Sequence, residues 1–350
     1  MSTTVEWLGM EETSIWRDCL RALPDELNDV YLLPEYGALY EDEKTTPQCF
    51  LFKKDGEVFL YPFLRQETPF LDDYYDITTA YGYGGPVYTT PDGVFLSEAL
   101  AAFDALAKER NIVAELIKFN PLLGMHQGLR PVFRGEIIPV CNTVFVEIDI
   151  DEEYRWTKEY TAANRKGIKK SLRADGKVEF SDSPEAWARF DELYSGTMRH
   201  NKATGFYYFS EAYFQAIRKR LPENHTLASA IIDGTIGASM ILLHGNRYAY
   251  CHLIGTDPQY QRVGINNFLH HQCILWCKEN GIKRLLIGGG RTRGDDDPLL
   301  KFKKNFSKQL SMFHVGERVL NRPVYDKLVD MRNNANPEPP DSGKLFKYRF

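Results

Sequence analysis

The stretch LASAIIDGTIGASMILLHGNRYAYCHL, residues 227–253, indicates the fold of the second half of the chain. Three apolar runs are separated there by the pairs Asp233-Gly234 and Gly245-Asn246. Such pairs favour tight hairpin turns, so the stretch predicts three consecutive antiparallel strands. A helix ended by Gly281 and a further strand follow, which predicts an α/β domain. The expected elements are strands over 227–232, 237–244, 247–253 and 284–287 and a helix over 265–280.

The first half of the chain shows a similar succession. A hairpin with an Asp55-Gly56 turn precedes a glycine-rich loop, an amphipathic helix and an apolar strand. The sequence therefore predicts an α/β fold with mixed sheets, divided into a domain over residues 1–140 and a second over 141–332. Residues 333–350 are expected to be a Pro-rich linker and a basic-aromatic tail. The other expected elements are the hairpin at 51–63, strands at 112–119, 143–150 and 177–181, and helices at 95–109, 160–174, 184–198 and 211–221.

The composition excludes several classes of protein. Of 350 residues, 43% are hydrophobic and 26% are charged, which suits a packed core and differs from a disordered chain. Residues 1–12 show no secretory signal, and no apolar run is long enough to predict a membrane span. The six cysteines include no C-x-x-C pair and the eight histidines no H-x-x-x-H pair, so we expect no metal site. These features predict a reduced, cytoplasmic protein.

Basic residues concentrate in two windows of an otherwise acidic chain. Residues 155–177 contain eight basic and two acidic residues, and residues 283–308 contain eight and three. Because the whole chain has a net charge of −5, the windows, at +6 and +5, leave −16 for the rest. A localised anion site is one interpretation, and a solvated surface is the other. A nonspecific duplex binder would need a broader basic face.

The loop before the helix at 265–280 also suggests anion binding. Gln261, Gly264 and Asn266 lie in the segment QRVGIN between a strand and this helix, where backbone N–H groups favour an anion. The segment resembles the Q/R-x-x-G-x-G/A pattern with which Gcn5-related acetyltransferases, the GNAT superfamily, hold the pyrophosphate of coenzyme A. The resemblance implies cofactor binding by these three residues. Since Asn266 stands where the pattern has a small residue, we expect acetyl-CoA to bind weakly or not at all.

A second segment, LLKFKKNF at residues 299–306, follows the glycine-rich strand end at 287–290. It resembles the L-x-F-K-x-x-F signature of the FemABX family, peptidyltransferases that carry amino acids from aminoacyl-tRNA onto peptidoglycan precursors. Three further segments resemble the family in the same order. They are YGYGGPV at 81–87, similar to Y-x-x-R-G-P-V but with Gly84 in place of arginine, the basic helix at 165–176, and residues 266–290 with Trp276 and Gly281.

The resemblance implies two tandem GNAT-like domains and an acyltransferase that transfers an aminoacyl or acyl group to an amine. Its co-substrate would be an aminoacyl-tRNA or an acyl-CoA, with no other cofactor required. Its acceptor would be an anionic nucleotide-sugar or lipid-linked precursor of the bacterial cell envelope. Phrases at 115–123 and 197–203 resemble a sub-branch associated with surface-polysaccharide genes. Further implied partners are the acceptor arm of tRNA and, peripherally, the membrane surface.

The resemblance also implies roles for individual residues. Lys303 and Phe302 are the expected catalytic residues, with the Lys303 ammonium stabilising a tetrahedral oxyanion. A lysine in a K-F-K-K run also suits a solvent-facing position, so that alternative stays open. The residues expected to bind substrate are Tyr81, Tyr83, Gly85, Arg165, Lys169, Arg173, Tyr207, Tyr208, Gly289 and Gly290.

The basic helix has two stripes at helical spacing. Arg165, Lys169 and Arg173 recur every four residues, and Ile168 and Leu172 are expected to form an apolar stripe beside them. Because arginine offers a bidentate fork to phosphate, we expect the basic stripe to hold the acceptor's phosphates. The alternative is a solvated face. For the four tyrosines, the alternative to substrate contact is core packing.

Two other functions stay open from the sequence. One is coenzyme A-dependent N-acetylation of an amino sugar, which the segment QRVGIN would serve. The other is a non-catalytic module that binds a glycan or a peptide.

Overall fold

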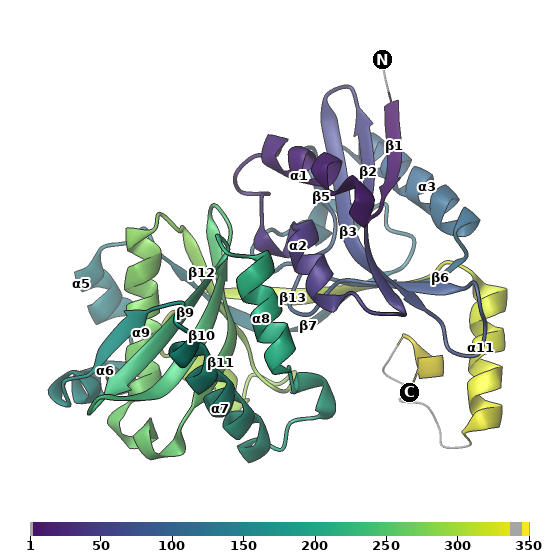
Figure 1. The fold of residues 1–350 in the computed structure, drawn as a ribbon. Helices are drawn as coiled ribbons and strands as arrows, with labels where there is room; N and C mark the ends of the chain where they lie inside the picture. The colour runs from purple at the N-terminus through teal and green to yellow at the C-terminus, as the bar shows by residue number, and fades with distance from the viewer. Residues whose placement is uncertain (1–2, 337–344, 350) are drawn as a thin grey trace. The chain divides into compact units, whose positions relative to one another are not determined.

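Contacts along the chain divide it into two units (Figure 1). The computed structural model describes residues 3–336 and 345–349. The N-terminal unit contains residues 1–140 together with 313–350, and the central unit contains residues 141–312. The chain passes from one unit to the other within β7 (Glu136–Glu147) and again within β13 (Leu310–Val319).

Alternating apolar residues build the sheet of the N-terminal unit. Its strands lie in the order β1-β2-β3-β4-β6-β13, with β4 and β6 parallel and the other neighbours antiparallel. The expected hairpin turn joins β2 to β3, where Asp55 and Gly56 both have positive φ, 53° and 88°. The elements of this unit are β1 (Thr3–Leu8), α1 (Thr13–Ala22), α2 (Pro34–Gly37), β2 (Thr45–Lys54), β3 (Glu57–Glu67), β4 (Tyr75–Thr78), β5 (Val87–Tyr88), α3 (Gly93–Glu109), β6 (Ile112–Lys118), α4 (His126–Leu129) and α11 (Arg322–Ala335).

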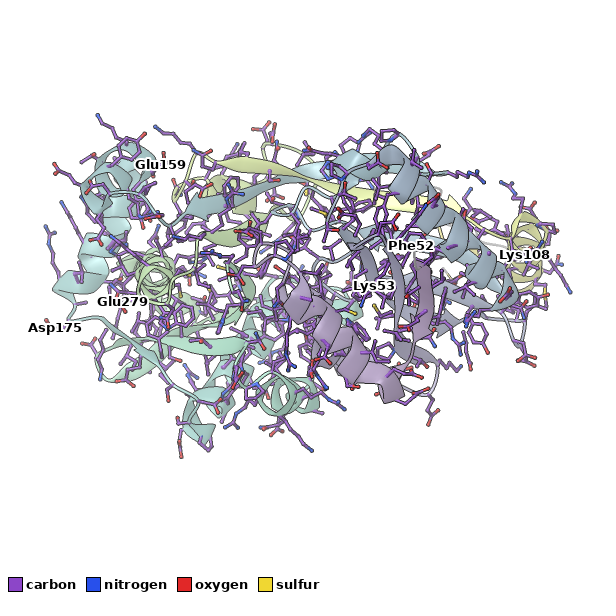
Figure 2. The ribbon with its side chains drawn as sticks, turned by 90° about the horizontal axis from the view of Figure 1, so that it is seen from above. Phe52, Lys53, Lys108, Glu159, Asp175 and Glu279 are labelled. Carbon is purple, nitrogen blue, oxygen red and sulfur yellow. The ribbon has the colours of Figure 1, made fainter. Side chains whose placement is uncertain are left out.

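Helices cover both faces of this sheet. Successive residues of a strand point to opposite faces, so β2 contributes to two clusters of buried side chains. Leu51 packs with Trp16 and Leu20 of α1, while Phe50 packs with Phe103 of α3. Side chains at helix ends lie at the surface, as Lys108 of α3 does in Figure 2.

Residues 313–332 belong to the N-terminal unit, so their predicted place in the second domain is wrong. The physical reason is the pairing of β13 with β6, which a buried ion cluster reinforces. Arg318 of β13, 3% exposed, donates to Glu115 of β6 and to Asp104 of α3, the latter at 2.8 Å. Helix α11 then packs on β6 through Tyr325 and Leu328.

The tail also packs against this unit. The predicted linker is wrong for residues 333–335, which continue α11, and residues 337–344 of the Pro-rich segment lie outside the described residues. Beyond them, Tyr348 donates to Oδ1 of Asp76 at 2.5 Å, and Nε of Arg349 donates to Oδ2 at 2.7 Å. Because Asp76 is fully buried in β4, these residues stabilise a carboxylate that would otherwise have little compensation.

The central unit confirms the three antiparallel strands predicted from residues 227–253. Its sheet continues in the order β7-β12-β11-β10-β9-β8. Asp175, in the turn between α6 and β8, and Glu279, the last residue of α9, lie at the surface in Figure 2. The elements are α5 (Glu152–Tyr154), α6 (Ala162–Arg173), β8 (Lys177–Phe180), α7 (Pro184–His200), α8 (Glu211–Arg220), β9 (His225–Ile232), β10 (Thr235–His244), β11 (Tyr248–Thr256), α9 (Ile265–Glu279), β12 (Arg284–Gly289) and α10 (Pro298–Lys303).

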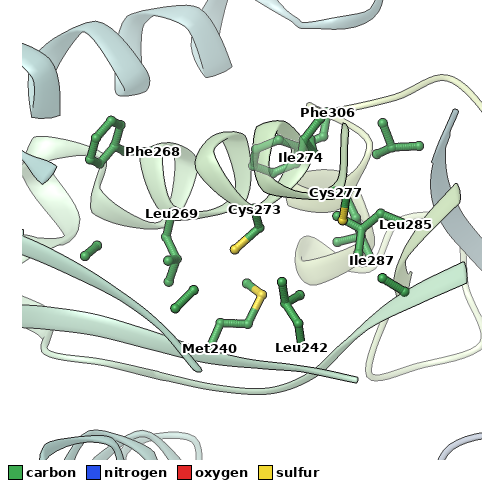
Figure 3. Close-up of a cluster of buried hydrophobic side chains, with 14 of the residues drawn as sticks. Met240, Leu242, Phe268, Leu269, Cys273, Ile274, Cys277, Leu285, Ile287 and Phe306 are labelled. Atoms are coloured by element: carbon green, nitrogen blue, oxygen red, sulfur yellow. The ribbon is translucent and has the colours of Figure 1, made fainter. Parts of the chain in front are cut away.

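Helix α9 forms the core of the central unit against β10 and β12. Figure 3 shows Leu269 and Cys273 pointing from the helix toward Met240 and Leu242 on β10. All four side chains are buried. The i, i+4 spacing of Cys273 and Cys277 thus serves packing, and burial raises the pKa of both thiols well above the ordinary value.

Two neighbouring strands of the central unit diverge. Strands β11 and β12 pair in parallel over three residues each, from Tyr248 and Arg284 to Tyr250 and Leu286, although both strands continue. Beyond that point β12 pairs with β7 through Gly288 and Gly289, after a bulge at Ile287. The last residues of β12 therefore leave β11 unpaired on that side.

No helix in the described ranges combines the length and the apolar character of a membrane span.

Replacing Arg349 by Met should lower the free energy of unfolding by about 3 kcal/mol, because a buried carboxylate loses its charged partner. Burial raises the pKa of Asp76 and the Arg349 charge lowers it, so the variant's Asp76 has a still higher folded pKa. An acid with a raised folded pKa destabilises the fold above that pKa, and the penalty disappears as the pH falls below it. Urea denaturation should therefore show a smaller loss at pH 5 than at pH 8. The matched control is Arg322→Met, whose exposed pair with Asp326 contributes little; equal losses in the two variants would contradict this account.

Candidate functional site

A lysine lies at the point where β11 and β12 diverge. The Nζ atom of Lys303, the last residue of α10, donates to the carbonyl oxygen of Gly289 at 2.8 Å. Gly289 pairs with β7 and not with β11, so its carbonyl is available for this bond. Burial lowers the pKa of Lys303 to about 8, and the nearby Cys251, Cys141 and Asp297 act in the opposite direction. The result is a mostly protonated ammonium in a fixed, weakly solvated position at neutral pH.

The apolar residues of α10 determine which lysine points inward. Leu300 and Phe306 are buried, and Phe302 packs edge-on against Phe306 with ring centroids 5.4 Å apart. His270 of α9 stacks on Phe306 at 4.8 Å. Because these rings pack against the unit, the side chain of the adjacent Lys303 is directed toward Gly289 at the end of β12. The rings of Phe302 and Phe306 thus fix the direction of the neighbouring amine.

The two neighbouring lysines have different surroundings. Lys301 is exposed and pairs with Asp296 at 2.8 Å, and Lys304 lies 3.7 Å from Asp295. Each therefore has an acidic partner, whereas Lys303 bonds to a backbone carbonyl. The three lysines thus differ in their surroundings, while the catalytic roles of Lys303 and Phe302 remain predictions.

The glycines at the end of β12 have separate structural roles. Gly289 supplies the carbonyl that Lys303 binds. Gly290 lies against the carboxylate of Asp297, where an added Cβ would stand 2.6 Å from Cγ. Asp297 was not found from the sequence, since it is one of three consecutive acidic residues and only its burial, 5% exposed, distinguishes it.

Helix α6 packs directly on the loop that was expected to hold a pyrophosphate. Gly264 has a φ of 78°, and an added Cβ would lie 2.5 Å from the carbonyl oxygen of Gly167 in α6. Ser171 of α6 donates to the carbonyl of Val263 at 2.8 Å. Asn266 accepts from the hydroxyl of Thr256 at 2.9 Å, and Gln261 is exposed. The loop is therefore closely covered by a helix on at least one side.

The basic stripe of α6 divides between internal and exposed positions. Arg165 is half-buried and donates to the carbonyl of Trp156 at 3.0 Å and to that of Tyr160. Lys169 and Arg173 are exposed, with the Lys169 ammonium 5.8 Å from the Trp156 ring. Arg165 thus caps the turn before α6, and Lys169 and Arg173 are the members free to meet a ligand.

The predicted apolar stripe of α6 is wrong at Leu172, which is 50% exposed. The buried residues are Asn164, Ile168 and Ser171, because α6 packs on α9 through polar side chains. Asn164 accepts from Asn267 of α9 at 2.8 Å, and its amide donates to the carbonyl of Asn305 at 3.1 Å. This second bond links α6 to the segment that follows Lys303.

The tyrosine loop lies in the N-terminal unit. Gly84 N donates to the carbonyl of Lys118 at 2.8 Å, and Gly85, with φ 89°, approaches Ile117 so closely that an added Cβ would stand 2.8 Å from it. Tyr81 and Tyr83 are half-buried, and the Tyr83 ring meets Tyr31 edge-on. A pocket opens here, lined by Trp16, Tyr31, Leu33, Tyr83 and Gly84 together with residues of β3.

Lys118, which sequence reasoning missed, lies beneath this pocket. Its Nζ atom donates to the carbonyls of Thr79 and Ala80, at 3.2 and 3.3 Å, and both residues line the pocket. Burial lowers the pKa of Lys118 to about 8. A lysine at the end of an apolar strand was the available signal, and it was not distinguishable from a surface residue.

The last pair of predicted binding residues is exposed. Tyr207 and Tyr208 follow each other in the loop between α7 and α8, each somewhat over 40% exposed. The Tyr194 hydroxyl donates to the carbonyl of Tyr207 at 2.6 Å, so the loop is attached to α7. Within the described residues, no group of three or more metal-binding side chains is arranged to hold an ion.

Residues 161–303 match the family model described as the acetyltransferase (GNAT) domain. Most of the central unit is therefore similar to a GNAT acetyltransferase domain. The match covers α6, the loop at 261–266 and α10 with Lys303, and the segment at 81–87 lies outside it. By contrast, no curated protein matches the chain by sequence.

Solved structures extend the GNAT likeness over most of the chain. The chain is similar to FemX, with a TM-score of 0.72, 16% identity and coverage of 92% of this chain and 99% of FemX. It is also similar to a tandem GNAT protein from the clavulanic acid biosynthesis pathway, with a TM-score of 0.51, 10% identity and coverage of 91% and 99%. A third is the C-terminal domain of a putative lysylphosphatidylglycerol synthetase from Agrobacterium fabrum, with a TM-score of 0.55, 13% identity and coverage of 88% and 91%. These likenesses confirm the predicted α/β fold with two tandem GNAT-like domains.

Acetyl-CoA should bind with a dissociation constant weaker than about 1 mM, or show no heat of binding, in a calorimetric titration. The reason is the contact of Gly167 with Gly264, which places a helix against the loop that would have to hold the pyrophosphate. A GNAT enzyme with known acetyl-CoA affinity, titrated in the same buffer, is the control. Micromolar binding that disappears in a Gly264→Glu variant would contradict this prediction.

Proposed function

We propose that this protein is a GNAT-type acyltransferase that transfers an activated aminoacyl group to an amine, with Lys303 stabilising the oxyanion of the transition state. The observation that carries the proposal is the ammonium of Lys303, fixed at 2.8 Å on the Gly289 carbonyl beside the unpaired edge of β11. The match of residues 161–303 to an acetyltransferase domain supports the reaction class.

The reaction needs orientation and charge stabilisation more than a covalent enzyme intermediate. The donor ester or thioester is already activated, so the neutral amine attacks its carbonyl carbon directly. The carbonyl oxygen becomes negative in the tetrahedral intermediate. The intermediate collapses as the C–O or C–S bond breaks, and the proton lost by the amine passes to the departing oxygen or sulfur, so that the alcohol or thiol leaves. A fixed ammonium interacts more strongly with the negative oxygen than with the neutral carbonyl, and so it favours the transition state over the bound substrate.

For the donor we propose an aminoacyl-tRNA. The packing of α6 on the loop at 261–266 supports this choice over coenzyme A, because that loop is where a pyrophosphate would be expected. Exposed Lys169 and Arg173, which lie one helical turn apart on α6, supply positive charge for a phosphate of either substrate.

For the acceptor we propose an amine on an anionic nucleotide-sugar or lipid-linked precursor of the cell envelope. The half-buried rings of Tyr81 and Tyr83 in the N-terminal unit are the proposed contacts for a ring of this substrate. Gly85, Tyr207 and Tyr208 are further proposed contacts. Such a reaction would take place in the cytoplasm, at the membrane surface when the precursor is lipid-linked.

A second candidate is acyl-CoA-dependent N-acetylation of an amino sugar. It is favoured by the matched family model, which describes an acetyltransferase. Calorimetric titration with acetyl-CoA, charged tRNA and UDP-sugars, followed by mass spectrometry of the mixed reaction, separates the two candidates. Transfer from charged tRNA supports our proposal, and transfer from acetyl-CoA supports the alternative.

Lys303→Met should reduce kcat about 10²–10³-fold, the usual loss for one oxyanion donor, while the affinity for both substrates changes little. Lys301→Met and Lys304→Met are matched controls on the same helix, since both side chains pair with surface acids. Their kcat should stay within about threefold of the wild type. If all three variants lose activity equally, or if only binding changes, Lys303 does not have the proposed role.

The pH dependence of kcat should show a decline as the pH rises through about 8. Burial lowers the pKa of Lys303 to about 8, and above this value the amine loses the charge that stabilises the oxyanion. Replacement by arginine, which keeps its charge, should remove the decline even if the rate is lower. A Lys303-dependent rate that increases through pH 8 would instead indicate that the neutral amine acts as a base.

A further inference from the structure

We infer that Asp297 is the positioning residue of the Lys303 site, because its two carboxylate oxygens hold the glycine loop and the lysine helix in one fixed arrangement. The inference rests on the proposed function only for its effect on catalysis. The geometry itself is a property of the central unit.

Each carboxylate oxygen of Asp297 serves a different segment. Oδ1 accepts from the backbone N–H groups of Leu299 and Leu300, at 2.8 and 3.0 Å, at the start of α10. Oδ2 accepts from the backbone of Arg291 at 3.0 Å and from Thr292 twice, through its N–H at 2.9 Å and its hydroxyl at 3.0 Å. An ordinary helix cap would explain the Oδ1 bonds alone. The Oδ2 bonds attach the loop that continues from Gly289.

The two segments held by Asp297 contain the two partners of the lysine hydrogen bond. Gly289, whose carbonyl accepts the bond, comes two residues before Arg291. Lys303, the donor, is three residues after Leu300 on a helix of six residues. A shift of either segment would lengthen the 2.8 Å bond and move the ammonium, and positions at a reacting centre tolerate little displacement.

The site also depends on a glycine at 290. An added Cβ there would lie 2.6 Å from both Cγ and Oδ1 of Asp297, so a side chain would displace the carboxylate. This close approach explains why residue 290 is a glycine. Gly290 was predicted from the sequence to bind substrate; in the structure it lies against Asp297, and its contact with substrate stays a prediction.

Five donors require two acceptor oxygens, so an amide cannot replace the carboxylate. An asparagine would keep one oxygen for α10 and place an NH₂ group against the three donors of the loop. The loss of the negative charge would also lower the pKa of Lys303. Burial lowers the pKa of Lys303, and Cys251 of β11, Cys141 of β7 and Asp297 raise it, Asp297 being the carboxylate among them. Burial also lowers the pKa of His270 of α9, and the Lys303 charge lowers it further. The charge of Asp297 is itself stable, because burial is outweighed by hydrogen bonds from Leu300, Thr292 and Arg291 that lower its pKa to about 2.

The test compares Asp297→Asn with Asp296→Asn, a neighbouring exposed acid that pairs with Lys301. In protein labelled with ¹⁵N-lysine, the Nζ resonance of Lys303 is assigned by its absence in Lys303→Arg and titrated with pH. We expect Asp297→Asn to lower the Lys303 pKa, and Asp296→Asn to leave it unchanged. An unchanged Lys303 pKa in a folded Asp297→Asn protein would overturn the inference.

Hydrogen exchange supplies a second readout that needs no substrate and begins with the wild-type protein. In the wild type, the amides of Arg291, Thr292, Leu299 and Leu300 should be protected; rapid exchange of Arg291 and Thr292 would overturn the inference. In Asp297→Asn the loop amides should exchange faster while those of Leu299 and Leu300 stay protected. Where Asp297→Asn does not fold, Asp297→Ser, which can still cap α10, is measured in its place.

Kinetics separate this inference from the proposed function. With aminoacyl-tRNA as donor, Asp297→Asn should reduce kcat at least about tenfold while KM changes less than about threefold, as for a residue that acts through Lys303. If Lys303→Met keeps full activity, the proposed function fails, and the titration and exchange results still decide whether Asp297 positions Lys303. If Lys303→Met is inactive and Asp297→Asn is fully active, the positioning role is wrong.

Discussion

The arrangement of the central unit depends on the point at which β11 and β12 stop pairing. Parallel pairing past Tyr250 and Leu286 would use the backbone groups that follow, and the Gly289 carbonyl would have no need of a side-chain partner. After the bulge at Ile287, where Gly288 has a positive φ, β12 keeps its pairing with β7 and loses its pairing with β11. An unpaired carbonyl in a partly buried position requires a donor, and Lys303 provides one. The end of the β11–β12 pairing and the inward direction of Lys303 are thus linked, because the lysine bonds to the carbonyl that the lost pairing leaves.

The N-terminal unit has the same succession of strands but closes the equivalent position. Its parallel pair, β4 and β6, is extended by the following loop, since Thr79 N donates to Leu116 and Gly84 N to Lys118. The loop backbone therefore stays paired along β6, whereas in the central unit the pairing of β11 with β12 has ended at the corresponding point. Each unit nevertheless places a half-buried lysine on backbone carbonyls near this point, Lys118 in one and Lys303 in the other. The two units thus share an architecture but differ in the groups that surround these two lysines.

Local sequence signals predicted much of this structure. The Asp-Gly and Gly-Asn pairs located the hairpins, because turn chemistry acts over a few residues. The assignment of residues 313–332 failed, since the pairing of β13 with β6 joins segments about 200 residues apart and leaves no local pattern. Leu172 was misplaced because α6 packs through Asn164 and Ser171, and polar helix contacts carry no hydrophobic period. Asp297 and Lys118 were missed for a related reason: what distinguishes them is burial, which neighbouring residues far along the chain create.

Strand β13 and helix α11 come late in the chain but belong to the N-terminal unit, and this has a consequence for folding during synthesis. The central unit is one continuous segment, residues 141–312, and can complete its sheet before later residues have been translated. The N-terminal unit, although synthesised first, lacks β13 and α11 until the ribosome has passed residue 335, and Asp76 lacks its partners until residue 349. Until then the edge of β6 and the apolar surface around Val113 stay uncovered, and both are features that promote association between nascent chains. The order of folding is therefore expected to be the reverse of the order of synthesis, with the second-made unit finished first.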